Sequence, residues 1–416
     1  SSFLYNFNNN NSNISIAEAL RRAKNANNSQ TLMVFYIGDP ALKLAIPKPT
    51  IVLTKINDEP IETSTTVLNA LSKIKLSGEI RNIDGNILLS NYNGDVAVQI
   101  FDKSINRNTL GNDGTRNGSN NLIIMNFQTL GETIFRGNAS VTNGLFDIEF
   151  IVPRDISIPL GNGRVSLYAK SALPTLQDQT GYNIAIPIGG INENAAEDNI
   201  GPRVRLYMND QTFISGGITN ESPFFLAFLE DENGINTASG IGHDIVAILD
   251  GDENNPYILN DYYETELNDY TKGKVRFPFR DLAPGLHTIT FRAWDVYNNP
   301  VTAEIQFIVI GDDVVKLTNV LNYPNPFVSY TQFWFSHNRP FEPLDVQVQI
   351  FTITGKIVKT INQVINTEGF LSREITWDGK DDFGDKIGKG VYIYKLTVKS
   401  TLSNKKAEKT EKLVIL

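Results

Sequence analysis

The sequence predicts a mainly β protein made of tandem immunoglobulin-like β-sandwich modules, preceded by a helix and a strand that end an α/β unit. Beyond residue 47, short runs of alternating apolar and polar residues recur, separated by turns rich in Gly, Asn and Asp. Near the N-terminus, one capped helix precedes a continuous apolar run. The chain has 416 residues, of which 41% are hydrophobic, and this suffices to bury about three ordinary cores.

The composition excludes several kinds of site within this chain. It contains no cysteine, so it can form no disulfide, thiolate metal site or cysteine nucleophile. Three histidines leave little room for imidazole catalysis or a histidine-rich metal centre. The formal net charge of −9 argues against a nucleic-acid partner, because neutralising phosphates requires clustered lysine and arginine. The sequence also has no apolar run long enough to predict a membrane-spanning helix.

Residues 1–46 have the pattern expected at the end of an α/β domain. Ser15 and Glu18 form a capping box, which predicts a helix over residues 15–24. The apolar run 32–37 predicts a strand buried on both faces. Because one helix and one strand cannot build such a sheet alone, we expect the earlier part of this domain to be absent from the chain.

Three β modules are expected after this unit, at residues 47–200, 201–312 and 313–416. Short strands joined without helices are typical of β-sandwiches. Asp-Gly and Asn-Gly pairs predict hairpin turns at 84–85, 93–94 and 143–144. The clearest expected strands are 74–80, 95–101, 145–151, 163–170, 203–208, 224–229, 244–249, 288–294, 303–310, 332–336, 344–351, 356–361, 371–377, 390–400 and 407–415.

The sequence predicts no catalytic, cofactor-binding or metal-binding residue. No G-x-S-x-G nucleophile elbow occurs, and the histidines are interpreted as turn or core-edge residues: His243, His287 and His337. Acidic turns could supply oxygen ligands for calcium, but none matches the EF-hand spacing. Solvated Asx turns are therefore the favoured interpretation of residues 231–234, 250–254 and 378–385.

The last module carries several motifs that together resemble the C-terminal sorting domain of type IX secretion cargo in Bacteroidota. They are Tyr-Pro-Asn-Pro-Phe at 323–327, Ile-Thr-Gly-Lys at 353–356, Trp-Asp-Gly at 377–379, Gly-Val-Tyr at 390–392 and Lys-Leu-Val at 412–414. Other segments are similar to the gingipain-like sortases of the same secretion system. These segments are 36–44, 231–236, 240–244, 259–263, 284–287 and 293–299.

This resemblance implies that the parent protein removes sorting domains from exported cargo and attaches the cargo to surface lipopolysaccharide. Residues 1–46 would then end a caspase-like cysteine peptidase domain, whose catalytic Cys and His lie upstream. The chain alone is therefore predicted to be inactive, with no cofactor. The resemblance also implies a cell-surface location at the outer membrane, in an attachment complex where the retained sorting domain holds a β-barrel shuttle, PorV, beside PorQ and PorZ.

We expect the last module to dock on that barrel through the loop at residues 378–390. Loops carry recognition on rigid sandwich scaffolds. Phe383 is expected at the loop tip, and the alternative that it folds back onto its own module stays open. The predicted partner-binding residues are Phe327, Asp381, Asp382, Phe383, Lys386 and Lys389.

The favoured function is the non-catalytic C-terminal half of a sortase, which spaces the peptidase domain and docks on the barrel. A second possibility is a surface adhesin or carbohydrate-binding β-module protein that the same system exports. A third is an intact hydrolase that uses serine or carboxylate chemistry. A glycan array separates the second function from the first.

Overall fold

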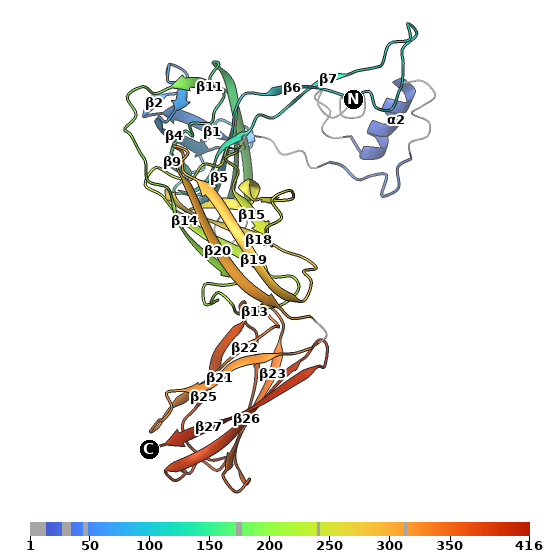
Figure 1. The fold of residues 1–416 in the computed structure, drawn as a ribbon. Helices are drawn as coiled ribbons and strands as arrows, with labels where there is room; N and C mark the ends of the chain where they lie inside the picture. The colour runs from blue at the N-terminus through green and yellow to red at the C-terminus, as the bar shows by residue number, and fades with distance from the viewer. Residues whose placement is uncertain (1–13, 27–34, 45–48, 172–176, 239–241, 312–313) are drawn as a thin grey trace.

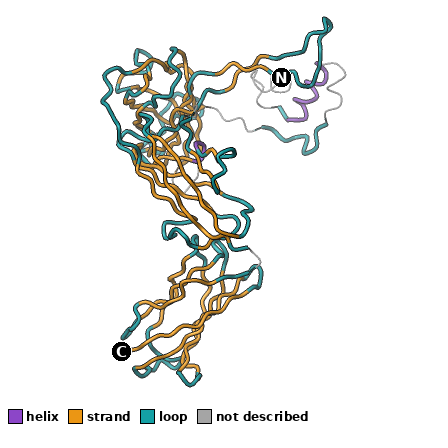
Figure 2. The backbone as a smooth tube through the Cα atoms, viewed as in Figure 1, coloured by secondary structure: helices purple, strands orange, loops and turns teal. Residues whose placement is uncertain are grey.

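A computed structural model describes residues 14–26, 35–44, 49–171, 177–238, 242–311 and 314–416. Three β modules follow one another in an elongated arrangement, and the helix lies to one side of the first (Figure 1). Strand dominates all three modules (Figure 2), so the mainly β prediction is confirmed. The described segments contain no helix with the length and apolarity that crossing a bilayer requires.

The N-terminal helix is confirmed, but the strand expected after it is not. Helix α2 spans Ile16–Ala26, and the Glu18 amide donates to Ser15 Oγ at 3.2 Å, as the capping box predicts. Residues 35–37 form no strand, and residues 32–34 lie outside the described part. Ile37 is 96% exposed. A strand of this kind is stable only between neighbouring strands, and residues 35–37 pair with none.

The first module, β1 to β11, contains a nine-stranded sheet with the path β8-β5-β10-β11-β1-β4-β9, to which β2 and β3 are attached. Alternate residues of these strands form one apolar core. A separate two-stranded arm, β6 and β7, extends from the module toward α2 (Figure 1). The strands are β1 Pro49–Ile56, β2 Glu59–Pro60, β3 Leu68–Ala70, β4 Lys73–Ile80, β5 Gly94–Phe101, β6 Ile105–Asn108, β7 Asn126–Thr129, β8 Thr133–Val141, β9 Leu145–Ile151, β10 Gly161–Ser171 and β11 Asp178–Ile191.

Two of the predicted turns in this module have different outcomes. Asn143 and Gly144 have φ of 53° and 79° and connect β8 to β9, as a two-residue hairpin turn requires. Gly94 instead begins β5, so the hairpin turn predicted at 93–94 is wrong. A Cβ at Gly94 would collide with the Lys170 backbone of the neighbouring strand. Glycine is needed there for close approach of two strands rather than for a turn.

The second module, β12 to β20, packs a four-stranded sheet, β12-β14-β18-β17, against a five-stranded sheet, β13-β20-β19-β15-β16. Phe225, Phe291 and Phe307 lie in the core between them. Its elements are β12 Arg203–Met208, β13 Ile218–Thr219, β14 Phe224–Glu230, β15 Val246–Leu249, β16 Tyr257–Ile258, η2 Asn260–Tyr262, β17 Tyr263–Glu266, β18 Asp269–Pro278, β19 Gly285–Trp294 and β20 Pro300–Val309.

The third module, β21 to β27, packs the sheet β21-β22-β25 against the sheet β24-β23-β26-β27. Phe333, Trp377 and Tyr394 are buried between the two sheets. Strands β9, β12, β25 and β26 have the predicted bounds. The strands of this module are β21 Leu317–Tyr323, β22 Thr331–His337, β23 Leu344–Thr352, β24 Ile357–Ile365, β25 Leu371–Trp377, β26 Gly390–Ser400 and β27 Lys406–Ile415.

Candidate functional site

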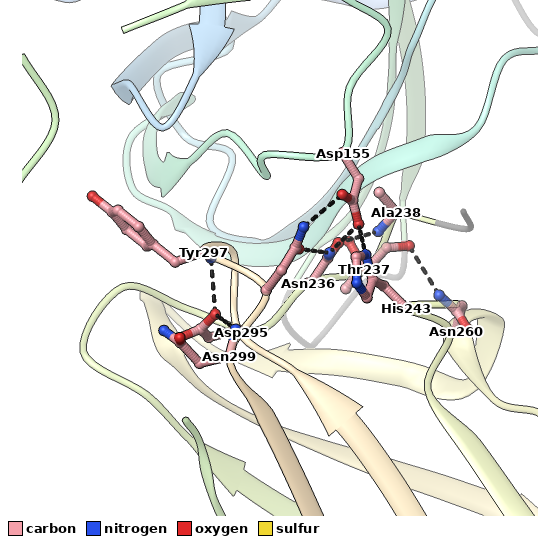
Figure 3. Close-up of polar contacts among 10 residues, drawn as sticks. Asp155, Asn236, Thr237, Ala238, His243, Asn260, Asp295, Tyr297 and Asn299 are labelled. Carbon is pink, nitrogen blue, oxygen red and sulfur yellow. Dashed lines mark hydrogen bonds and ion pairs between the residues drawn. The ribbon is translucent and has the colours of Figure 1, made fainter. Parts of the chain in front are cut away.

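A polar network joins the first module to the second around Asp155, in the loop after β9 (Figure 3). The Asp155 carboxylate accepts hydrogen bonds from Asn236 Nδ2 at 2.9 Å and Asn298 Nδ2 at 2.7 Å. His243 Nδ1 lies 2.7 Å from the same carboxylate. Three side chains of the second module thus converge on one carboxylate of the first. Losing one member would leave polar groups unpaired, so the network favours one placement of the two modules.

A second contact between these modules involves strand β8 of the first module. Arg136 of β8 donates to the carboxylate of Asp261 at 2.8 Å and to its backbone carbonyl at 2.6 Å. Asn138 and Leu267 form a β-bridge between the modules. The second module is therefore held against the first at two separate places.

The histidines do not form a catalytic triad within the described segments. His243 pairs with Asp155, and His287 lies between Asp250 and the Ala283 carbonyl, each at 2.7 Å. His337 is fully buried, and its Nε2 lies 3.0 Å from Thr367 Oγ1. No described histidine contacts both a carboxylate and a serine or threonine hydroxyl. The geometry agrees with the interpretation of these histidines as structural residues.

Three carboxylates meet where the segment between β11 and β12 contacts loops of the second module: Asp198, Asp231 and Asp295. One oxygen of each lies within 4.8 Å of the others, and Asp231 and Asp295 are buried. Asp231 Oδ1 accepts the Asn233 amide at 2.9 Å, which is the predicted Asx turn. Both oxygens of Asp295 also accept hydrogen bonds. Because protein donors already bond to at least one oxygen of each of the three carboxylates, we assign no ion to the group.

Burial and the two neighbouring carboxylates raise the pKa of Asp231 to about 6. Between about pH 4 and pH 6, the Asp231 carboxyl keeps its proton in the folded chain, whereas in the unfolded chain it has already lost this proton. This contribution to stability is complete below pH 4 and is lost as the pH rises through about 6. We expect the second module to lose about 1 kcal/mol between pH 5 and 7 through this group. Calorimetry of Asp231→Asn should show a flatter pH dependence, and an unchanged slope would contradict the assignment.

Five of the six predicted partner-binding residues lie on the loop between β25 and β26. Asp381 Oδ1 accepts the amides of Phe383 and Asp385 at 2.9 Å, which shapes the tight turn. Asp382 accepts the Thr360 amide at 3.3 Å and thereby ties the loop to β24. Phe383 is 92% exposed, so it does not fold back onto its own module. The other two loop residues, Lys386 and Lys389, are exposed.

The sixth residue, Phe327, lies in the core rather than at the surface. It is 2% exposed, and its ring packs edge-on against Trp377 at 5.5 Å. Its amide donates to the Val414 carbonyl at 3.1 Å, and its carbonyl accepts the Leu416 amide at 2.8 Å. These contacts hold Phe327, between β21 and β22, against the C-terminal strand β27. Its side chain is not available to a partner, so we remove it from the docking residues.

The structure adds exposed apolar residues at the same end of the module. Ile353 lies in the β23–β24 turn, and Ile357, Val391 and Ile393 lie on the outer face of the adjoining strands. Together with Phe383 they make up what we call the distal apolar surface. The sequence offered one signal for it. Residues 391–394 are apolar at consecutive positions, so the core could take only alternate side chains of this strand.

No protein-family model matches the chain, and no curated protein matches it. Among solved structures, latent dimeric PorU from Porphyromonas gingivalis is 28% identical over 99% of this chain, with a TM-score of 0.40. A Bacteroides ovatus mixed-linkage glucan-binding protein, SGBP-B, is 12% identical over 79% of this chain and 64% of its own, with a TM-score of 0.24. A tandem repeat of a large adhesion protein is 13% identical over 89% of this chain and 74% of its own, with a TM-score of 0.19. The chain spans 38% of the PorU chain, and it is similar to PorU in sequence along nearly its whole length.

Proposed function

We propose that this chain is the non-catalytic C-terminal portion of a PorU-like sortase. The observation that carries the proposal is the 28% sequence identity to PorU over 99% of the chain. The short motifs of the third module and the distal apolar surface support the same function. In this proposal the first two modules space a peptidase domain from the membrane. The third module docks on a PorV-like outer-membrane barrel, beside PorQ- and PorZ-like subunits at the cell surface.

The chemistry of cleavage and transfer lies outside this chain in the proposal. A cysteine nucleophile needs a thiol, and the chain has none. The peptidase that removes cargo sorting domains and attaches cargo to lipopolysaccharide would belong to the remainder of the parent protein. In this proposal the chain positions the peptidase domain. The junction around Asp155 holds the first two modules together, and the third module presents the loop at residues 378–390, which we call the docking loop.

The docking loop has the properties of a recognition element. Asp381 and Asp382 fix its backbone, so little conformational entropy is lost when it binds. Phe383 projects from a turn that is already formed, with Lys386 and Lys389 exposed beside it. An aromatic side chain that enters a pocket, surrounded by charged groups, is a common hot-spot arrangement.

The docking test compares two exposed apolar residues at opposite ends of the third module. Phe383→Ala should weaken binding to a purified PorV-like barrel about tenfold or more, because burial of one Phe contributes about 2–3 kcal/mol. Leu402→Ala is the matched control: it is also exposed, lies in the β26–β27 turn, and should not change affinity. Truncation after residue 313 should abolish binding. Full affinity of the truncated chain would place the docking function elsewhere.

A further inference from the structure

Strand β24 lies at the edge of the sheet β24-β23-β26-β27, with β23 on one side only. The Thr360 amide donates to Asp382 Oδ1 at 3.3 Å, so the backbone N–H of Thr360 points away from β23. Every second residue of an antiparallel strand directs its N–H and C=O groups to the same side. The N–H and C=O groups of Asn362 and Val364 therefore also point outward from the sheet.

These outward groups are unpaired. Within the described residues, no hydrogen bond reaches the backbone of Asn362 or Val364 on this side. Val364 is 63% exposed. The Asn362 side chain accepts a hydrogen bond from Gln347 Nε2 of β23 at 2.9 Å, so it leans back over the sheet and leaves the edge uncovered. Two residues of β24 thus present a short row of free backbone donors and acceptors.

The opposite edge of the same sheet, β27, is protected. The Val414 amide donates to Asn325 Oδ1 at 3.0 Å, and the Lys412 carbonyl accepts Asn325 Nδ2 at 3.1 Å. Residues 406–411 of that strand carry four charged side chains, which disfavour pairing with another strand. Residues 360–366 of the open edge carry no charge, and four of them are β-branched. This composition favours strand pairing.

The open stretch has a defined length. The docking loop covers its beginning, where the Asp382 amide also donates to the Val358 carbonyl at 3.3 Å. Beyond its end, the Glu368 carbonyl accepts Asn209 Nδ2 of the second module at 3.3 Å. The edge from Thr360 to residue 365 is about 17 Å long. It therefore accommodates an extended segment of about five residues.

We propose that this edge pairs with an extended segment of the barrel partner, which adds a strand to the sheet. The inference rests on the proposed docking through Phe383. Asp382 belongs to the docking loop and bonds to this same edge, so a partner seated on Phe383 lies within a few residues of Asn362. Free backbone groups at strand spacing select an extended polypeptide, because its own N–H and C=O groups match them. The segment is uncharged and places an apolar side chain opposite Val364.

Hydrogen exchange resolved to single amides tests the pairing on the full chain, with and without the purified barrel. In the free chain, the amides of Asn362 and Val364 should exchange faster than those of Ile361 and Gln363, which point to β23. Barrel binding should slow the exchange of the two outward amides by about tenfold or more, because each gains a backbone hydrogen bond. The exposed amides of the β26–β27 turn, at residues 402–404, should not change.

Val364→Pro tests the same contact by affinity. Proline removes the outward N–H of an edge strand without breaking a bond within the sheet. Barrel binding should weaken about tenfold or more. Val364→Thr is the matched control: it keeps the N–H and the β-branched shape, and affinity should change less than about threefold. Thermal unfolding of the two variants shows whether the proline is tolerated. If it is not, the exchange experiment on the unmodified chain decides.

The possible failures are distinguishable. If the barrel binds and the amides of Asn362 and Val364 remain unprotected, the edge pairing is wrong, whereas docking through Phe383 stands. Full affinity of a folded Val364→Pro variant leads to the same conclusion. Protection of both amides in the chain alone, increasing with chain concentration, would assign the edge to a second copy and overturn the proposal. If the barrel does not bind at all, both the docking and the edge pairing are wrong.

Discussion

Replacement of Phe327 by Ala should destabilise the third module by about 3–5 kcal/mol, the range for removing a large buried aromatic side chain. The ring fills the core against Trp377, and the backbone at this residue holds the C-terminal strand β27. The substitution leaves a cavity beside Trp377 that the prolines on either side of Asn325 give the chain little freedom to fill. Thermal unfolding followed by calorimetry should show the third module melting well below the other two.

Phe383→Ala is the matched control, since it removes the same ring from the same module. Its side chain is exposed, so the unfolding temperature of the module should not change. Phe327→Ala therefore tests the stability of the third module, whereas Phe383→Ala tests its binding to the barrel. If Phe327→Ala keeps full stability but loses barrel binding, then Phe327 is a contact residue, as the sequence motif alone suggested.

Acidification should destabilise the third module by about 3 kcal/mol between neutral pH and pH 4 through His337 alone. Burial lowers the pKa of His337 to about 4. The unfolded chain takes up a proton near pH 6.5, whereas the folded chain does not until about pH 4. The stability is thus complete above pH 6.5 and is lost as the pH falls through the folded pKa. This direction is opposite to that expected for Asp231.

The hydrogen bonds around His337 explain why it resists protonation. Thr367 Oγ1 donates to the Gly369 carbonyl at 2.9 Å, so it accepts from Nε2 of His337. Nδ1 in turn accepts the Arg339 amide at 3.2 Å. A second proton would have to occupy Nδ1 and displace that amide. His337→Gln, which keeps a donor toward Thr367, should remove the acid sensitivity, and an equal loss of stability in both proteins would rule out His337 as its source.

Much of the local structure followed from residue patterns alone. The alternation of apolar residues in β12 and β25 determined their bounds, because a strand with one buried face has a period of two. Asn143 and Gly144 determined a hairpin, because few other pairs adopt two positive φ values. Ser15 determined where the helix starts. Each of these features depends on interactions between residues that are near in sequence.

Local patterns gave wrong predictions where contacts with residues distant in sequence determine the structure. Asn93-Gly94 has the same dipeptide as the true hairpin, but the approach of β10 makes Gly94 a strand residue. The run 35–37 is apolar enough for a buried strand, yet a strand needs partners that the sequence cannot supply locally. Phe327 follows two prolines as a loop residue would, and only its contact with Trp377 places it in the core.

The class of fold, the bounds of strands such as β12 and β25 and the loop that carries Phe383 follow from the sequence, because these depend on short-range periodicity and turn chemistry. Other strands, among them β1, β8, β11 and β18, were not predicted, and which residues meet depends on the tertiary structure. Asp155 contacts Asn236 and Asn298 across more than 80 residues, and Tyr168 faces Lys274 across a cleft between two modules. Such contacts leave no periodic signal in one sequence. They arise because the burial of three separate cores fixes where the surfaces of neighbouring modules come together.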